Sequence, residues 1–348
     1  MKGAIDTPYE LKRIAIVSEA INQKPIEGIR KYSKELSSAF EACKKFSVYR
    51  VGFSEEIAEN GGSLAKFKEI IHCRRKLKEI DPDITIYIPS SPRIIMNLLK
   101  ILLWKGKSRR NVLILLQPPT GMAPFARRIL NGVILYRQFD SKLLPPSLQE
   151  RNWKVIPSGA NTSHFKPITK NEKDKLKIQY GFSPGDRIIL SVGHLTEGRN
   201  LNLIMKISKT ITAKTIFVTN EIRADDPVLK TQLKESGVII FDRYLEKIQD
   251  LYSISDCYVF PTVNPGSAIG MPLSILEALS CNIPVVSAKF GIIHEILKEE
   301  DGITFFNDDE SAIMLIRKII SETSDNYSNQ SAINFGWNEI VKKIISEM

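Results

Sequence analysis

The sequence is poor in the residues that bind metals or form disulfides. Its 348 residues include only four cysteines and four histidines, and the cysteines form no CxxC pair. Because there is also no HExxH motif and no His/Cys cluster, we expect no bound metal. Cysteines this far apart are typical of buried thiols in a reducing compartment, which indicates a cytoplasmic protein.

Long apolar runs are missing too. The first residues, MKGAIDTPYELKR, contain no apolar segment like that of a secretory signal, and no run of about 18 apolar residues follows. A membrane-spanning helix is therefore not expected. The first apolar strand runs into EAINQKPIEG, which lacks the G-x-G-x-x-G of pyridine-nucleotide dehydrogenases and disfavours that class of enzyme.

Acidic residues are fewer than basic ones. With 49 Lys and Arg against 39 Asp and Glu, the formal charge is +10 and the pI is near 9.3. Such a surface attracts nucleotides, phosphate esters, anionic lipid headgroups or nucleic acid. No zinc finger, helix-turn-helix or RNP-type strand accompanies the charge, and the basic residues are widely spread, so nucleic acid is not expected as a partner.

Short β-branched runs alternate with longer amphipathic stretches, which predicts parallel sheets with helical crossovers. The length exceeds that of one compact core. We therefore predict an α/β protein of two Rossmann-like domains, residues 1–162 and 163–330, that face each other across a cleft. In such sheets a ligand lies at the carboxyl ends of the strands. The predicted strands are 13–18, 84–89, 112–116, 153–159, 187–193, 215–219, 237–241, 257–261 and 284–288, and the predicted helices are 28–43, 171–182, 199–210, 245–254 and 273–281.

Three stretches near predicted strand ends carry residues suited to a phosphate-containing ligand. Arg199 starts a predicted helix, where a guanidinium and unpaired helix amides would make an anion site. In GMPLSILEALS the helix begins near Leu273, and Glu277, one turn later, would accept hydrogen bonds from ribose hydroxyls. Gly28, in the loop after the first strand, would permit the close approach of a diphosphate.

Each of these residues also has a simpler explanation. Arg199 would then be a surface arginine near a helix start, and Gly28 would be a turn glycine. Glu277 would complement a helix dipole, which is worth about 0.3–1 kcal/mol. Single motifs of this kind are weak, so the interpretation depends on their order along the chain.

Taken together in this order, the segments resemble the retaining two-domain glycosyltransferases of the GT-B fold, specifically family 4, the glycosyl transferases group 1. The resemblance covers most of the chain and rests on five segments. They are KRIAIVSEAINQKPIEGIRKYSKEL near the start, VIPSGANTSHFKP (155–167), KLKIQYGFSPGDRIILSVGHLTEGRNLNLIMKI (175–207), DCYVFPTV…GMPLSILEALSCNIPVVSAKFGIIHEIL (256–297) and FGWNEIVKKII (335–345). The last, within 331–348, resembles a closing helix that in this fold crosses back onto the first domain.

The resemblance implies a nucleotide-sugar donor, a glycan or lipid-linked acceptor, no cofactor, and a retaining, metal-independent transfer. Arg199 falls where the family grips the donor diphosphate, and Glu277 falls on the second acid of its E-x7-E pattern, which holds the ribose. The implied catalytic residues are Arg199, Glu277 and Gln117, and the implied donor-binding residues are Gly28, His194, Arg199, Met271, Leu273, Ser274 and Glu277.

Three positions depart from the family pattern. Ile269 stands where the first acid of E-x7-E is expected, His194 replaces an arginine beside the phosphate, and Gln117 replaces a histidine near the sugar. The nucleotide half of the site is thus kept, and the sugar half is altered. Two interpretations follow: a divergent transferase with an unusual donor or acceptor, which we favour, or a catalytically degenerate protein that binds nucleotide sugars.

The stretch SPRIIMNLLKILLWKGKSRRN (91–111) is both apolar and basic. Arg93, Asn97 and Lys100 form a polar stripe at helical spacing and leave a wide apolar face. That face would lie on the inner face of the cell membrane, with 93–110 as a peripheral contact near a lipid-linked or envelope glycan acceptor. The alternative is a crossover helix packed on its sheet beside a solvated basic loop.

Overall fold

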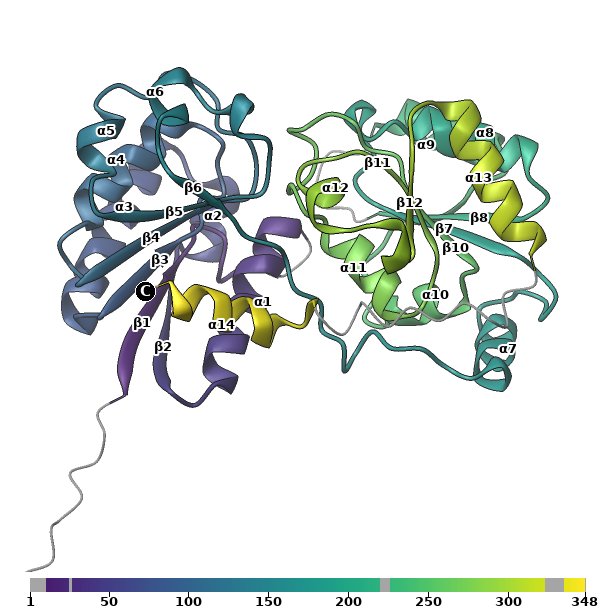
Figure 1. Ribbon diagram of the computed structural model, residues 1–348, viewed down its shortest axis with the longest axis horizontal. Helices are drawn as coiled ribbons and strands as arrows, with labels where there is room; N and C mark the ends of the chain where they lie inside the picture. Colours follow the sequence, from purple (N-terminus) through teal and green to yellow (C-terminus); the bar gives the residue numbers. More distant parts are fainter. Residues whose placement is uncertain (1–10, 25–26, 220–225, 323–334, 348) are drawn as a thin grey trace, which may run out of the picture.

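The computed structural model describes residues 11–24, 27–219, 226–322 and 335–347, which form two six-stranded parallel sheets flanked by helices. The two sheets occupy the two halves of the molecule in Figure 1. This α/β architecture confirms the predicted pair of Rossmann-like domains. The boundaries at 162/163 and 330/331 stay predictions, and the second lies outside the described residues.

The first sheet contains six strands. They are β1 (Lys12–Val17), β2 (Phe46–Val51), β3 (Ile84–Tyr87), β4 (Arg110–Leu115), β5 (Val133–Arg137) and β6 (Trp153–Val155). The strands lie in the order β2-β1-β3-β4-β5-β6, and every neighbouring pair is parallel. All six carboxyl ends therefore meet at one edge of the sheet.

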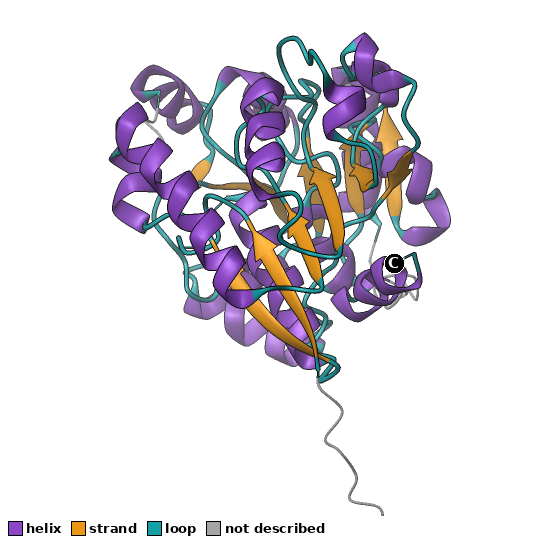
Figure 2. Cartoon of the chain, turned by 90° about the vertical axis from the view of Figure 1, so that its left-hand side faces the viewer, coloured by secondary structure: helices purple, strands orange, loops and turns teal. Residues whose placement is uncertain are grey.

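Helices cover both faces of this sheet, as Figure 2 shows. They are α1 (Gly28–Ala42), α2 (Glu55–Asn60), α3 (Ser63–Ile80), α4 (Ile94–Trp104), α5 (Ala126–Ile129), α6 (Pro146–Gln149) and, from the end of the chain, α14 (Trp337–Ser346). Because side chains alternate along a strand, Ile14 and Ile16 of β1 pack with α1 and α14, whereas Ala15 and Val17 pack with α3, α4 and α5.

The second sheet is built the same way. Its strands are β7 (Ile188–Val192), β8 (Lys214–Val218), β9 (Ile239–Phe241), β10 (Cys257–Phe260), β11 (Val285–Ala288) and β12 (Ile303–Phe306), in the order β12-β11-β10-β7-β8-β9. Its helices are α7 (Lys170–Gln179), α8 (Leu201–Thr210), α9 (Pro227–Glu235), α10 (Ile248–Ile254), α11 (Leu273–Ser280), α12 (Ile293–Ile296) and α13 (Asp309–Ser321). All nine predicted strands are present, and β2, β5 and β12 were not predicted.

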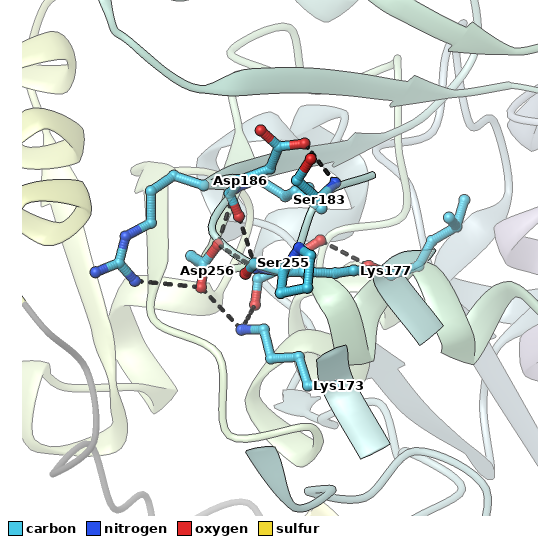
Figure 3. Close-up of polar contacts among 10 residues, drawn as sticks. Lys173, Lys177, Ser183, Asp186, Ser255 and Asp256 are labelled. Carbon is cyan, nitrogen blue, oxygen red and sulfur yellow. Dashed lines mark hydrogen bonds and ion pairs between the residues drawn. The ribbon is translucent and has the colours of Figure 1, made fainter. Parts of the chain in front are cut away.

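A buried carboxylate anchors the start of the second domain. Asp256, directly before β10, accepts hydrogen bonds from the Lys173 ammonium and the Ile188 amide, both at 2.8 Å (Figure 3). Lys177 and Arg187 lie 3.7 and 3.6 Å from the same carboxylate. Burial lowers the pKa of Lys177, and the charge of Asp256 opposes that shift. The cluster ties α7 to the edge at which β7 and β10 begin.

The last helix packs on the first domain. The rings of Trp337 on α14 and Tyr32 on α1 are 5.1 Å apart and nearly perpendicular. Glu347, just beyond α14, accepts a hydrogen bond from the Tyr136 hydroxyl of β5 at 2.7 Å. The chain therefore ends beside the sheet in which it began (Figure 1).

Candidate active site

The carboxyl edges of the two sheets meet through the loop that follows β10. The Gly270 amide donates to the Leu116 carbonyl, just beyond β4, at 2.7 Å. The Ser158 hydroxyl, beyond β6, donates to the Met271 carbonyl at 2.7 Å, and the Met271 amide donates to the Gln138 side-chain oxygen, beyond β5, at 3.4 Å. Residues from both domains therefore line the region in which the sequence predicted a ligand.

This contact requires glycine at position 270. A Cβ atom added there would lie 1.5 Å from the Gln138 carbonyl oxygen, far inside the van der Waals limit. The backbone fixes the position of a Cβ atom, and the oxygen that it would meet is itself a backbone atom. A side chain at position 270 would therefore force the two loops apart.

Arg199 lies beyond β7, at the end of the short turn Glu197–Arg199, and does not start a helix as predicted, because α8 begins at Leu201 after the left-handed Asn200. Its guanidinium covers Gly193, since a Cβ atom at that glycine would be 3.4 Å from Arg199 Nη1. Burial raises the pKa of Tyr258 on β10, and the charges of Glu277 and Arg199 act on that phenol with opposite signs. Because β7 and β10 are neighbouring parallel strands, Arg199 beyond β7 and Glu277 on the helix after β10 lie at the same edge of the sheet.

The helix α11 begins at Leu273, where the sequence placed it. Pro272 precedes it and supplies no side-chain hydrogen bond to the first turn. The amides of Leu273 and Ser274 therefore keep the anion-binding capacity of a helix N-terminus. Met271, which the sequence predicted as a donor-binding residue, has its amide and carbonyl engaged with Gln138 and Ser158 in the domain contact, and its donor-binding role stays a prediction.

Glu277 forms an ion pair that sequence analysis did not foresee. The Glu277 side chain is 6% exposed, and Lys31 on α1 donates to its Oε1 atom from the other domain. The Lys31 ammonium also lies 5.1 Å from the centroid of the Phe165 ring, a cation–π geometry. Lys31 is three residues after Gly28, one helical turn on the same face, and that spacing was the available signal.

Glu35 extends this polar cluster along α1. Burial raises the pKa of the Glu35 carboxyl, Lys31 opposes the shift, Glu277 adds to it, and His164 again opposes it. Two acids and one lysine therefore share the interface between α1 and α11. A carboxyl with a shifted pKa, such as that of Glu35, is common at functional sites.

Gly28 and Ile269 pack directly on each other. Gly28 was expected in the loop before the first helix, but it is the first residue of α1. Residues 25–26, which precede it, lie outside the described part of the chain. A Cβ atom at Gly28 would be 3.3 Å from Ile269 Cγ2. Ile269 is buried within the core of the first domain, so an apolar contact fills the position at which the family pattern has its first acid.

Gln117 and His194 lie on opposite domains. Gln117, beyond β4, donates from Nε2 to the Gly266 carbonyl at 3.3 Å and so contacts the loop of the second domain. His194 directly follows Gly193 after β7 and is half-buried. Within the described ranges, no group of three or more His, Cys, Asp or Glu side chains is arranged to hold a metal ion.

Part of the second half of the chain matches a known protein family. Residues 172–336 match the family described as glycosyl transferases group 1. The alpha-galactosylglucosyldiacylglycerol synthase of Streptococcus pneumoniae is 20% identical over 185 residues, which are 50% of this chain and 48% of the synthase. The chain thus matches about half the length of that relative.

Two solved structures share the whole fold. A glycosyltransferase from Rickettsia africae superposes with a TM-score of 0.75 at 16% identity and covers 97% of this chain and 98% of its own. Anabaena HepE, solved in complex with UDP and glucose, superposes with a TM-score of 0.71 at 15% identity and covers 97% of this chain and 100% of its own. Both likenesses establish the GT-B arrangement of the two domains.

Proposed function

We propose that this chain, which carries a glycosyl transferases group 1 domain at residues 172–336, transfers a sugar from a nucleoside-diphosphate sugar to a glycan or lipid-linked acceptor. The observation that carries the proposal is that Arg199 follows β7, while the start of α11 and the buried Glu277 follow β10, the neighbouring parallel strand. Both elements lie within residues 172–336, the part of the chain that matches the family.

Each group has a role in the proposed chemistry. Breaking the sugar–phosphate bond places negative charge on the leaving diphosphate and positive charge on the sugar. Arg199 and the amides of Leu273 and Ser274 would stabilise the diphosphate from fixed positions, as preorganised donors do. Glu277 would accept hydrogen bonds from the ribose, and Gly28 would let the start of α1 approach the diphosphate.

We infer that the transfer retains the configuration of the anomeric carbon and needs no metal. The leaving phosphate oxygen takes the proton of the acceptor hydroxyl as the new glycosidic bond forms, so no protein base is required. Gln117, a hydrogen-bond donor and acceptor, would orient the sugar or the acceptor. The buried Ile269 can hydrogen-bond no substrate group, and the half-buried His194 would lie beside the donor phosphate.

The donor and acceptor classes draw support from the relatives. HepE was also solved in complex with UDP-glucose, which makes UDP-sugars the first donors to examine. The Streptococcus pneumoniae relative is named as the synthase of a glycosylated diacylglycerol, which favours a lipid-linked acceptor.

A donor panel tests this function. The protein is incubated with UDP-, GDP- and ADP-sugars, with and without diacylglycerol-containing vesicles, and free nucleoside diphosphate is measured. We expect release from one class of donor, undiminished by EDTA, and an unchanged anomeric configuration in the product by NMR. Tight nucleotide binding without turnover of any donor would favour the degenerate binding protein instead.

The phosphate role of Arg199 is tested by Arg199→Ala. Loss of a charge-assisted hydrogen bond costs about 1.5–3 kcal/mol, so nucleoside-diphosphate affinity should fall roughly 10- to 100-fold while nucleoside affinity changes little. Arg317→Ala, an exposed arginine on α13 of the same domain, is the matched control. Equal losses for nucleoside and nucleoside diphosphate would remove the assigned role.

A further inference from the structure

The helix α4 is turned with its polar side chains inward. Asn97 and Lys100 are 1% and 6% exposed, although sequence analysis grouped them as the polar stripe of the helix. Lys100 forms an ion pair with the buried Glu19 carboxylate, and Asn97 donates to the Ser91 carbonyl at 2.9 Å. The same carboxylate accepts a hydrogen bond from the Tyr87 hydroxyl at 2.7 Å. These contacts fix the rotation of the helix about its axis.

The opposite face of α4 presents only large apolar side chains. Such a face is unusual on a soluble protein, because contiguous exposed apolar surface generally marks an interaction site. Its exposed residues are Ile95, Met96, Leu99 and Leu102, which recur at helical spacing along one stripe.

A neighbouring loop adds two more exposed apolar side chains. The loop is joined to the start of α4, because the Ile94 amide donates to the Thr120 carbonyl at 3.0 Å. Met122 and Phe125 in this loop are 82% and 80% exposed. Phe125 also has a φ of +57°, a left-handed conformation that is rare for a bulky residue. Strain of this kind is often retained where it serves a function.

Exposed basic residues lie on the two helices that contact α4. Arg127 and Arg128 on α5 come two and three residues after Phe125, and both are exposed. On the other side of α4, the helix α3 carries the exposed Lys68 and Arg75. Both α3 and α5 contact α4, and Figure 1 shows the three helices together on one side of the first sheet.

We propose that this surface, made of the exposed face of α4 and the Met122–Phe125 loop, docks on an anionic lipid bilayer. In peripheral membrane helices, apolar side chains enter the bilayer at the level of the headgroups, and nearby basic side chains contact anionic headgroups. The 11 residues of α4 span about 16 Å, roughly half of the hydrocarbon core, so the helix lies on the bilayer. Of the helices in the described part of the chain, none has the length and apolar character needed to span a membrane.

The basic residues near this surface favour a bilayer over a second copy of the chain as its partner. Two copies packed through this face would bring Arg127, Arg128, Lys68 and Arg75 of one against the same cations of the other, and like charges oppose association. Anionic headgroups instead neutralise them. The bilayer is therefore the occupant that suits both the apolar and the basic parts of the surface.

Vesicle co-sedimentation of the full chain tests the proposal. Vesicles of phosphatidylcholine alone and of phosphatidylcholine with phosphatidylglycerol are compared at low and high salt. The triple variant L99Q/L102Q/F125N replaces exposed side chains only, and asparagine tolerates the left-handed conformation at 125. We expect binding to anionic vesicles at low salt, and a loss of partitioning of about tenfold or more in the variant.

Met314→Gln is the matched control, because Met314 is an equally exposed apolar residue on α13 of the second domain. It should bind vesicles like the wild type. The proposal would be overturned if the wild-type protein did not bind anionic vesicles at low salt. It would also be overturned if the triple variant bound them as strongly as the wild-type protein does. A wild-type dimer in ultracentrifugation that the triple variant abolishes would overturn it too, since the face would then be a self-association interface. Donor hydrolysis in solution does not involve this surface, so its outcome tests the transferase function separately.

Discussion

At the scale of single residues, Glu277 and Lys31 couple the two domains at the point where a ribose would bind. Lys31 takes one oxygen of a carboxylate that is almost wholly buried. Lys31 therefore acts as a positioning residue that holds the Glu277 carboxylate in place.

The Lys31→Met variant should lower the affinity for nucleoside diphosphate by about tenfold, as expected for loss of one charged hydrogen bond near 1.4 kcal/mol. Isothermal titration calorimetry with nucleoside diphosphate measures the affinity, and Lys31→Arg should restore most of it. Wild-type affinity in Lys31→Met would contradict the positioning role.

Glu19 shows how pH should act on the first domain. Burial would raise the pKa of this carboxyl, but the Lys100 charge and hydrogen bonds from Lys100, Ser90 and Tyr87 outweigh burial and hold it below 4.5. A lowered pKa contributes stability above the unfolded value, and that stability is lost as the pH falls through the folded value. The thermal unfolding midpoint of the protein should therefore decrease as the pH falls below about 4.3, the ordinary pKa of a glutamate.

The variant Glu19→Gln should flatten this acid dependence and lower stability by about 3 kcal/mol at neutral pH, since Lys100 is left buried without its partner. Glu41→Gln is the control, because Glu41 forms an exposed ion pair with Arg50. Such pairs contribute little. An unchanged slope for Glu19→Gln would mean that another group governs the acid transition.

At the scale of elements, the strands were predictable where the sequence has buried β-branched runs and not elsewhere. The edge strand β2, FSVYRV, has mostly half-buried or exposed residues, so it lacks the continuous apolar run that marked β1 and β4. The orientation of α4 was not predictable either. Asn97 and Lys100 of the predicted polar stripe face inward, because Glu19, 81 residues earlier in the chain, supplies the partner of Lys100, whereas Arg93 precedes the helix and is exposed.

The attachment of α7 depends on one acid. The Asp256→Asn variant should lower the stability of the second domain by about 3 kcal/mol, because three cations lose a buried counter-charge. Urea denaturation followed by fluorescence measures the change. Glu339→Gln on α14, which removes an exposed ion pair with Lys342, is the control and should leave the midpoint in place. An unaltered midpoint for Asp256→Asn would show that the cluster is energetically neutral.

At the scale of the whole molecule, the candidate site lies where the two domains meet. The roles of Arg199, Leu273 and Glu277 stay predictions, but their positions beyond strands of the second sheet were predictable because each lies at a recognisable motif. Lys31, Gln138 and Ser158 were not, because their roles arise from contacts between residues more than 100 positions apart.

The Gly270→Ala variant should separate the domain edges and reduce transferase turnover by about 100-fold or more, since misplacement of groups by about 1 Å can cost this much. Turnover and the radius of gyration in solution are measured together. Gly185→Ala is the control, because a Cβ atom there meets nothing within 4 Å and its φ is not left-handed. Wild-type turnover in Gly270→Ala would show that this contact is dispensable.

The contact of Gly28 with Ile269 has a consequence for attempts to divide the protein. Ile269 and Leu273 come from the second half of the chain, yet they belong to the same apolar cluster as Ile14 and Leu36 of the first half. A fragment ending near residue 162 would have a hole where these side chains insert, and the complementary fragment would expose them to water. Each half has its own sheet, but each is expected to need the other half in order to fold. Co-expression of the two halves should therefore give more folded protein than production of either half alone.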